Sequence, residues 1–314
     1  MRELTGLAAA ILVGLAGTGC TVGAPAPGAG TVPVSVPAAS ATPSAAASES
    51  VRPSASSSVT ATATASPAAL KVTSALNFRD LAGTGLSVEE GAMNTGAVYR
   101  SGKLATLSKA DRTRLAKAGI TDIIDLRTTA VAKASPDPTI KGANYHLVNV
   151  FAVDRRPVPA FRTVAAAKAF MRKTYTDFVT VPAQRKALGQ ALELIAAADG
   201  PVIVHCTEGK DRTGWVAALL QFTSGADENT VLAEYLKSND YRASLINRSY
   251  RETLKKRGAT AAKIQRAQLR VQESYLQAGR EQIERSYGSV HKYLRDGLGV
   301  SQEAIDALQK RFLD

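Results

Sequence analysis

A cysteine and an arginine six positions apart are the residues of this sequence best suited to chemistry. Cys206 follows an apolar run at 201–205 that predicts a buried strand, and Arg212 precedes a helical pattern at 213–222. A loop between a strand end and a helix start directs backbone N–H groups and the positive end of the helix dipole at one point. That cradle fits an oxyanion such as phosphate. The same field lowers a cysteine pKa below its free value of about 8.5, so we expect Cys206 to be a nucleophile at neutral pH.

The residues around Cys206 have complementary uses. Arg212 carries a planar fork that can clamp two phosphoryl oxygens, and Gly209 permits a backbone conformation that a Cβ would penalise. Thr213 can donate a hydrogen bond to the thiolate, and we expect His205 to anchor the loop or orient the cysteine. The predicted phosphate-binding residues are Thr207, Glu208, Gly209, Lys210, Asp211 and Arg212. A lone cysteine after a strand is often core filler, but the order of strand, glycine, cation and helix favours a site.

This segment also resembles a known family. His205-Cys206, five residues, then Arg212-Thr213-Gly214 is similar to the signature of the cysteine-dependent protein tyrosine phosphatase superfamily, in the form found in bacterial tyrosine-protein phosphatases of the secreted, actinobacterial type. The other similar runs are NFRDL at 77–81, YRSGKL at 99–104, DLR at 125–127, YLKSN at 235–239 and GSVHKYL at 288–294. Ala82 replaces a glycine of the family pattern, and residues 128–130 lack an acidic residue often found there.

The resemblance implies a two-step, metal-independent reaction without a cofactor. Cys206 would attack phosphorus to give phosphocysteine while an acid protonates the leaving oxygen, and water would then hydrolyse the intermediate. The implied substrates are phosphotyrosine proteins or small phosphomonoesters. Lysine at the position of Lys210 accompanies phosphoinositide activity in related enzymes, although the charge of Glu208 opposes it. The alternative is a catalytically inactive protein that binds phosphorylated ligands or acts in wall-associated interactions.

Three aspartates are candidates for the general acid. Asp125 ends a predicted strand, Asp211 lies within the loop, and Asp154 lies in a segment that could form a mobile loop. Asp125 could instead only pair with Arg127 or cap a helix. No Trp-Pro-Asp motif is present, so the sequence leaves the acid open.

Alternating strand and helix patterns must position this loop. Strands are predicted at 120–126, 145–150 and 201–205, all largely buried, and helices at 109–118 with Ser108 as N-cap, 163–178, 183–198 and 213–222. This alternation predicts an α/β fold with a mostly parallel central sheet flanked by helices. From residue 228 we expect a helical C-terminal third of four or five helices, punctuated by Gly258, Gly279, Gly288, Gly297 and Gly299.

Composition divides the chain into three parts. Residues 1–20 resemble a lipoprotein-type signal peptide whose Cys20 is lipidated; plain secretion, a retained anchor or a cytoplasmic tail are the alternatives. Residues 21–75 are rich in Ala, Ser, Thr and Pro and predict a disordered linker. Residues 76–314 form the predicted phosphatase-like domain. We therefore expect export, either as a lipoprotein tethered to the outer face of the cell membrane or as a secreted protein.

Charge and cysteine content narrow the function classes. The 314 residues hold 39 Lys and Arg against 27 Asp and Glu, a net charge of +12 with a pI near 9.8. Such a charge suits a nucleic-acid binder, yet no recognition motif accompanies it, and we expect no nucleic-acid partner. Two cysteines and three histidines exclude a disulfide scaffold and a zinc cluster. The basic stretch 251–285 could attract anionic substrates or membrane headgroups, cover the pocket, or be a solvated helix face.

Overall fold

The central sheet of this computed structural model, which describes residues 70–89 and 91–313, has the strand order β1-β4-β7-β5-β6. Its strands are β1 (Arg79–Asp80), β4 (Val98–Ser101), β5 (Asp122–Asp125), β6 (Asn144–Leu147) and β7 (Val202–His205). β1 is antiparallel to β4, and the other neighbours are parallel. His205 is in register with both Ser101 and Asp125. The loops after β4, β5 and β7 therefore meet at one edge, the usual ligand edge of a parallel sheet.

Helices account for most of the remaining elements. The helices that precede β7 in the chain are α1 (Lys109–Lys117), α2 (Thr129–Ala134), α3 (Val164–Thr180) and α4 (Pro182–Ala197). The helices that follow β7 are α5 (Arg212–Thr223), α6 (Glu228–Leu236), α7 (Ser238–Tyr241), α8 (Ala243–Leu269), α9 (Glu273–Tyr287), α10 (Val290–Lys292), the π-helical turn η1 (Tyr293–Gly297) and α11 (Gln302–Leu313). A small hairpin of β2 (Ser87–Val88) and β3 (Gly91–Ala92) stands apart from the main sheet.

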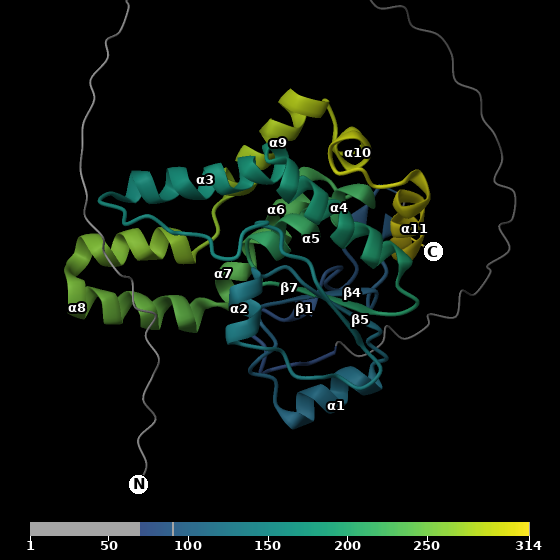
Figure 1. Ribbon diagram of the computed structural model, residues 1–314, viewed down its shortest axis with the longest axis horizontal. Helices are drawn as coiled ribbons and strands as arrows, with labels where there is room; N and C mark the ends of the chain where they lie inside the picture. Colours follow the sequence, from purple (N-terminus) through teal and green to yellow (C-terminus); the bar gives the residue numbers. More distant parts are fainter. Residues whose placement is uncertain (1–69, 90, 314) are drawn as a thin grey trace, which may run out of the picture. The chain divides into compact units, whose positions relative to one another are not determined.

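The central strands divide their side chains between two cores. Val202 and Val204 of β7 pack in the larger cluster with residues of α4, α5 and α9, whereas Ile203 packs in the smaller cluster with Leu115 of α1. This alternation is the two-residue period of a strand that is buried on both faces. Figure 1 shows the result, with α1 on one side of the sheet and α4, α5 and α6 on the other. The predicted class, α/β with a mostly parallel sheet between helices, is confirmed.

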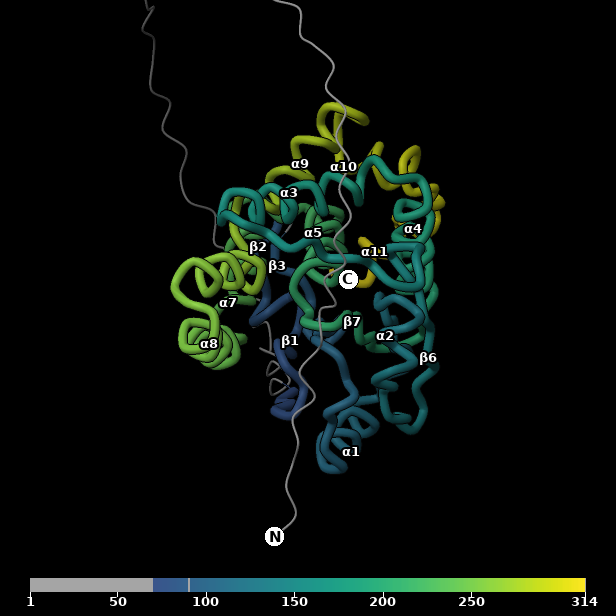
Figure 2. Tube along the Cα trace, turned by 60° about the vertical axis from the view of Figure 1, so that its left-hand side comes forward, coloured from purple at the N-terminus to yellow at the C-terminus, as the bar shows by residue number. Residues whose placement is uncertain are grey.

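The C-terminal third is helical, as predicted, but one of its glycines has a different role. Gly258, with φ +82°, divides α8 into two limbs, and Gly288 ends α9 in the left-handed conformation. Gly279, predicted to separate helices, lies inside α9, where an added Cβ would be 2.5 Å from the Trp215 ring. Its small size serves close packing rather than a chain break. Figure 2 shows the two limbs of α8 and the edge strand β6 at opposite sides of the molecule.

Two other expectations differ from the structure. The strand predicted at 145–150 to be largely buried is the edge strand β6, and Tyr145 and Leu147 are 48% and 37% exposed. The apolar signal came partly from Val148 and Val150, which are buried in the loop beyond the strand. The sequence assigns residues 70–75 to the linker, yet Val72 is buried in the smaller core cluster. Ordered packing thus begins before residue 76.

The N-terminal predictions concern residues outside the described part. The signal peptide at 1–20, its Cys20 and the linker up to residue 69 therefore stay predictions. Between residues 70 and 313, residue 90 aside, we find no helix with both the length and the apolar composition needed to cross a bilayer.

Candidate active site

The predicted loop joins β7 to α5 over residues 206–211 and packs against the loop after β4. Gly209 has φ +66°, and a Cβ there would lie 2.4 Å from the carbonyl group of Ser101. Gly102 is similarly confined, because its Cβ would lie 2.9 Å from the carbonyl oxygen of Leu76 and 3.3 Å from that of Thr207. Glycine at both positions lets the two backbones approach each other.

A buried polar network holds the loop from below. The carbonyl oxygen of Gly209 accepts hydrogen bonds from Asn77 Nδ2 at 2.7 Å and from Arg100 Nη2 at 2.9 Å. Arg79 Nη1 donates to Asn77 Oδ1 at 2.6 Å, and the carboxylate of Glu234 pairs with Arg79 Nε at 2.6 Å and Arg100 Nη1 at 2.5 Å. One carbonyl of the loop is thereby fixed by residues from β1, β4 and α6.

The charges of this network favour an ionised Glu234. Burial alone would raise the pKa of Glu234, but the charges of Arg100 and Arg79 outweigh it and lower the pKa below its usual value. Burial and the neighbouring Arg100 lower the pKa of Arg79 to about 10. Two guanidinium groups and one carboxylate therefore leave a net positive charge beneath the loop.

Cys206 is 2% exposed and has the properties of a thiolate nucleophile. Burial would raise its pKa, and Asp211 adds to that effect, but the charge of Arg212 and hydrogen bonds from the hydroxyl and N–H groups of Thr213 lower the pKa below its ordinary value. The Thr213 hydroxyl is buried, and no described residue competes with the thiol for its hydrogen bond.

Arg212 lies at the start of α5 with its charge uncommitted. Its Nη1 donates to the carbonyl oxygen of Leu126 at 2.9 Å and its Nη2 to Thr207 Oγ1 at 3.3 Å. Its guanidinium stacks over the Phe151 ring, 4.7 Å from the centroid. No carboxylate of the described residues lies within 4 Å of it, so the guanidinium can receive an anion.

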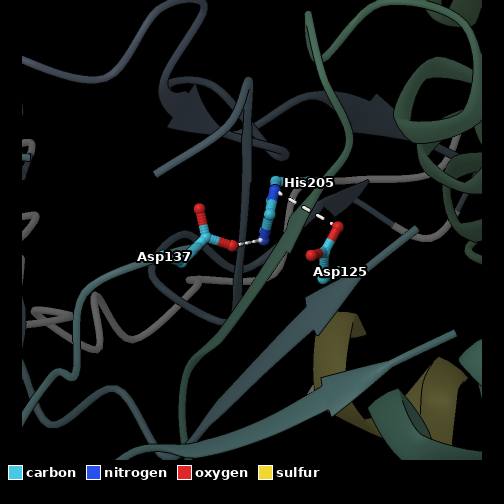
Figure 3. Close-up of side chains that lie close together, drawn as sticks. All are labelled: Asp125, Asp137 and His205. Carbon is cyan, nitrogen blue, oxygen red and sulfur yellow. Dashed lines mark ion pairs between the residues drawn. The ribbon is translucent and has the colours of Figure 1, made fainter. Parts of the chain in front are cut away.

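His205 lies between two carboxylates behind the loop (Figure 3). Its Nε2 is 3.1 Å from Asp137 Oδ2, and its Nδ1 is 3.9 Å from Asp125 Oδ1 and 3.3 Å from the carbonyl oxygen of Cys206. Arg127 Nη2 pairs with both carboxylates, at 2.7 Å and 2.5 Å. Although these three side chains have the spacing of metal ligands, the guanidinium already supplies the balancing charge. Their contacts are those of an anchor for the strand end.

Asp125 is poorly placed to act as the general acid. Its oxygens accept hydrogen bonds from the backbone N–H and the guanidinium of Arg127 and from Tyr145 Oη, and its side chain is 0% exposed. Burial would raise its pKa, but Arg127, His205 and Tyr145 together lower it. An acid that must carry a proton near neutral pH needs the opposite shift. The structure thus favours the alternative in which Asp125 pairs with Arg127.

Asp211 has a more suitable position in the loop itself. Tyr175 Oη donates to its Oδ1 at 3.1 Å, Lys210 Nζ lies 2.7 Å from its Oδ2, and its side chain is 22% exposed. Asp154 is exposed in the segment after β6 and makes no hydrogen bond or ion pair with a described residue. Of the three predicted candidates, Asp211 alone is both oriented and accessible.

The two other charged side chains of the loop are paired. Glu208 forms an ion pair with the buried Arg242, and Lys210, whose side chain is 4% exposed, pairs with Asp211. The negative charge of Glu208 is therefore neutralised within the protein. The predicted phosphate-binding positions 207–212 all lie in this one loop, and their contact with phosphate stays a prediction.

Several supporting residues escaped the sequence analysis. Glu234, Asp137, Phe151 and Tyr175 reach the site from four different elements or loops, and none lies near the loop in sequence. For Glu234, a charged residue inside an apolar helical run is a local signal of a buried ion pair. The others come to the site through tertiary packing.

Comparison with known proteins identifies a matching family. Residues 70–314 match the model described as the tyrosine phosphatase family. The triple specificity protein phosphatase PtpB of Mycobacterium tuberculosis is 32% identical over 278 residues, which cover 77% of this chain and 98% of that relative.

Two further relatives agree with this match. A protein of Cupriavidus necator is 33% identical over 232 residues, covering 71% of this chain and 82% of its own length. A tyrosine-protein phosphatase of Nostoc commune is 28% identical over 151 residues, covering 48% of this chain and 51% of the relative. The family match spans every described residue from which the site is built.

Proposed function

The chain belongs to the tyrosine phosphatase family, and we propose that it hydrolyses phosphotyrosine through a phosphocysteine intermediate on Cys206. It is a protein-tyrosine phosphatase; the proposal concerns how its residues perform the reaction. The observation that carries it is a buried thiol whose pKa is lowered chiefly by Arg212, a guanidinium that has no carboxylate partner among the described residues.

In the first step the thiolate of Cys206 attacks phosphorus while Arg212 and the loop N–H groups hold the phosphoryl oxygens. The bond between phosphorus and the leaving oxygen breaks, and Asp211 gives that oxygen a proton. In the second step water attacks phosphocysteine, Asp211 accepts a proton, and the sulfur leaves as a thiolate stabilised by Thr213.

Trapping the intermediate tests this mechanism. Wild-type protein mixed with ³²P-labelled phosphotyrosine peptide and quenched in acid should carry label on Cys206 and release phosphate on longer incubation. Cys206→Ser should lose both signals. Cys20→Ser, at the only other cysteine, is the matched control and should retain them. Wild-type protein that binds the peptide without releasing phosphate would instead be a binding or wall-associated interaction protein.

The substrate range extends beyond phosphotyrosine in this proposal. The name of the M. tuberculosis relative states triple specificity, and Lys210 places a second cation in the loop. Glu208, whose charge would oppose an anionic lipid, is paired with Arg242. Short-chain phosphoinositides should therefore be hydrolysed, and Lys210→Met should reduce that activity more than phosphotyrosine hydrolysis. Release of phosphate from phosphotyrosine peptides alone would remove the lipid substrates.

We also propose export of the chain and a lipid tether at Cys20. The support is the sequence pattern of residues 1–20 and the linker that follows. Labelled palmitate supplied to producing cells should enter wild-type protein in the membrane fraction but not Cys20→Ser. Unlabelled protein in the culture medium would indicate plain secretion instead.

A further inference from the structure

Two arginines share one aromatic ring at the site. The guanidinium carbon of Arg212 lies 4.7 Å from the Phe151 ring centroid, and that of Arg156 lies 4.2 Å from the same centroid. Phe151 lies in the segment after β6, four residues beyond Leu147, and is half-buried. Since one of these cations is the predicted phosphate clamp, the other brings a second positive charge to the neighbourhood of the reacting phosphate.

Arg156 has aromatic neighbours but no carboxylate. It stacks on Phe170 as well as Phe151, at 4.8 Å from the Phe170 centroid, and among the described residues its one hydrogen bond runs from Nη2 to Thr174 Oγ1 at 2.8 Å. Within the described part of the chain no Asp or Glu lies within 4 Å of it. Its remaining N–H groups make no hydrogen bond with a described residue and are not buried. They therefore reach solvent and are available to a ligand.

The four buried arginines of the described chain contrast with this arrangement. Arg79, Arg100, Arg127 and Arg242 each pair with a carboxylate. Arg156 instead lies in a partly dehydrated place without such an ion pair. Burial lowers its pKa, the more distant charges of Asp177 and Asp211 partly offset that effect, and the charge of Arg212 adds to it. A planar guanidinium held between two rings is oriented in advance for an anion.

We propose that Arg156 is a second anion subsite, which takes a second phosphate carried by the same molecule as the phosphate that reacts at Cys206. The inference rests on the proposed function and specifies its substrate class, phosphomonoesters that bear another phosphate group. Helix α3 connects the two functions, because Thr174 fixes Arg156 and the next residue, Tyr175, donates to Asp211. The subsite is thus built onto the helix that orients the acid.

A pair of substrates that differ only in the second phosphate tests the subsite. Phenyl phosphate and hydroquinone bisphosphate present the same aryl ester, and kcat/KM is measured for each. We expect wild-type protein to prefer the bisphosphate by about tenfold, the order of one charge-assisted contact. Arg156→Ala should reduce the ratio to near the statistical factor for two equivalent phosphates, with most of the loss in KM. Arg156→Lys, a point charge without the planar fork, should be intermediate.

Two control variants keep the test decisive. Arg155→Ala removes the adjacent exposed arginine and should keep the wild-type ratio; an equal fall would mean general attraction to a basic surface. Arg156→Met keeps the apolar stem on the rings, and it should lose the ratio as Arg156→Ala does. An unchanged ratio in Arg156→Ala and Arg156→Met overturns the inference, whereas failure of wild-type protein to hydrolyse phenyl phosphate overturns the proposed function itself. The same measurement on short-chain phosphoinositide mono- and bisphosphates shows whether lipid headgroups supply the second phosphate.

Discussion

Two aspartates near the catalytic loop have similar partners and opposite surroundings. Asp125 accepts from the hydroxyl of Tyr145 and pairs with Arg127, whereas Asp211 accepts from the hydroxyl of Tyr175 and pairs with Lys210. Each therefore has one tyrosine and one cation. Yet the side chain of Asp125 is 0% exposed and that of Asp211 is 22% exposed.

The cation beside each aspartate explains why Asp125 is enclosed and Asp211 is accessible. The fork of Arg127 contacts both oxygens of Asp125 and its backbone N–H adds a third bond, so the carboxylate is saturated and its pKa is lowered. Lys210 is a point charge without a planar fork and leaves the side chain of Asp211 22% exposed. A carboxylate enclosed by an arginine fork serves as structure, whereas one that stays accessible beside a lysine can reach a substrate.

The largest expected effect is on turnover by Asp211→Asn. If Asp211 is the proposed proton donor, its loss should lower kcat for phosphotyrosine by about 10²–10⁴-fold and remove the basic limb of the pH–rate profile. The loss should be smaller for p-nitrophenyl phosphate, because its more acidic leaving group needs less protonation.

Asp125→Asn tests whether the other aspartate is the general acid instead. If Asp125→Asn loses the basic limb in folded protein while Asp211→Asn keeps it, the assignment of the two roles is reversed. Steady-state kinetics from pH 4 to 9 on both variants decide between these outcomes.

The second prediction concerns stability. Asp125→Asn should reduce the free energy of unfolding by about 3 kcal/mol, since it leaves the buried Arg127 with Asp137 as its remaining carboxylate. Because folding lowers the pKa of Asp125, its contribution is complete above the unfolded pKa near 3.8 and is lost as pH falls through the folded pKa. Urea unfolding at several pH values should show the two proteins converging under acid. A constant difference would contradict the charge argument.

The third prediction assigns a positioning role to Tyr175. Tyr175→Phe removes the hydroxyl that orients Asp211 and should lower kcat by about tenfold with little change in KM, more for poor leaving groups than for good ones. Tyr235→Phe is the matched control, because the Tyr235 hydroxyl bonds that of Tyr175 at 2.7 Å without contacting Asp211. Equal effects of both variants on kcat would point to packing rather than to orientation of the acid.

The sequence predicts the position of Asp211 better than the role of Asp125. Cys206, Arg212 and Asp211 lie within seven residues between a strand and a helix, so local pattern suffices to place them together. The role of Asp125 depends on the arginine two residues later and on Tyr145 from the neighbouring strand, and only the strand register brings that tyrosine beside it. Local patterns carry no such pairing.

The fold was predictable to a similar extent. Helices with strong periodicity, such as α3 and α4, lie within two residues of their predicted bounds at each end. β1 and β4 are short and contain charged residues, Arg79 and Arg100, which are buried only because Glu234 of α6 meets them. Burial of a charge depends on a partner distant in sequence, and single-sequence hydropathy cannot report it.

The smallest expected effect is that of Tyr145→Phe, the counterpart of Tyr175→Phe at the structural aspartate. Its hydroxyl donates to Asp125 at 2.7 Å while the residue is 48% exposed, so removal of the hydroxyl should cost about 1 kcal/mol of unfolding free energy and leave kcat unchanged. In a double-mutant cycle with Asp125→Asn, much of this cost should disappear, since a neutral amide oxygen accepts a weaker hydrogen bond than the ionised carboxylate. Additive costs would show that Tyr145 stabilises the strand edge through its ring, and a fall in kcat comparable with that of Tyr175→Phe would place Asp125 in the reaction after all.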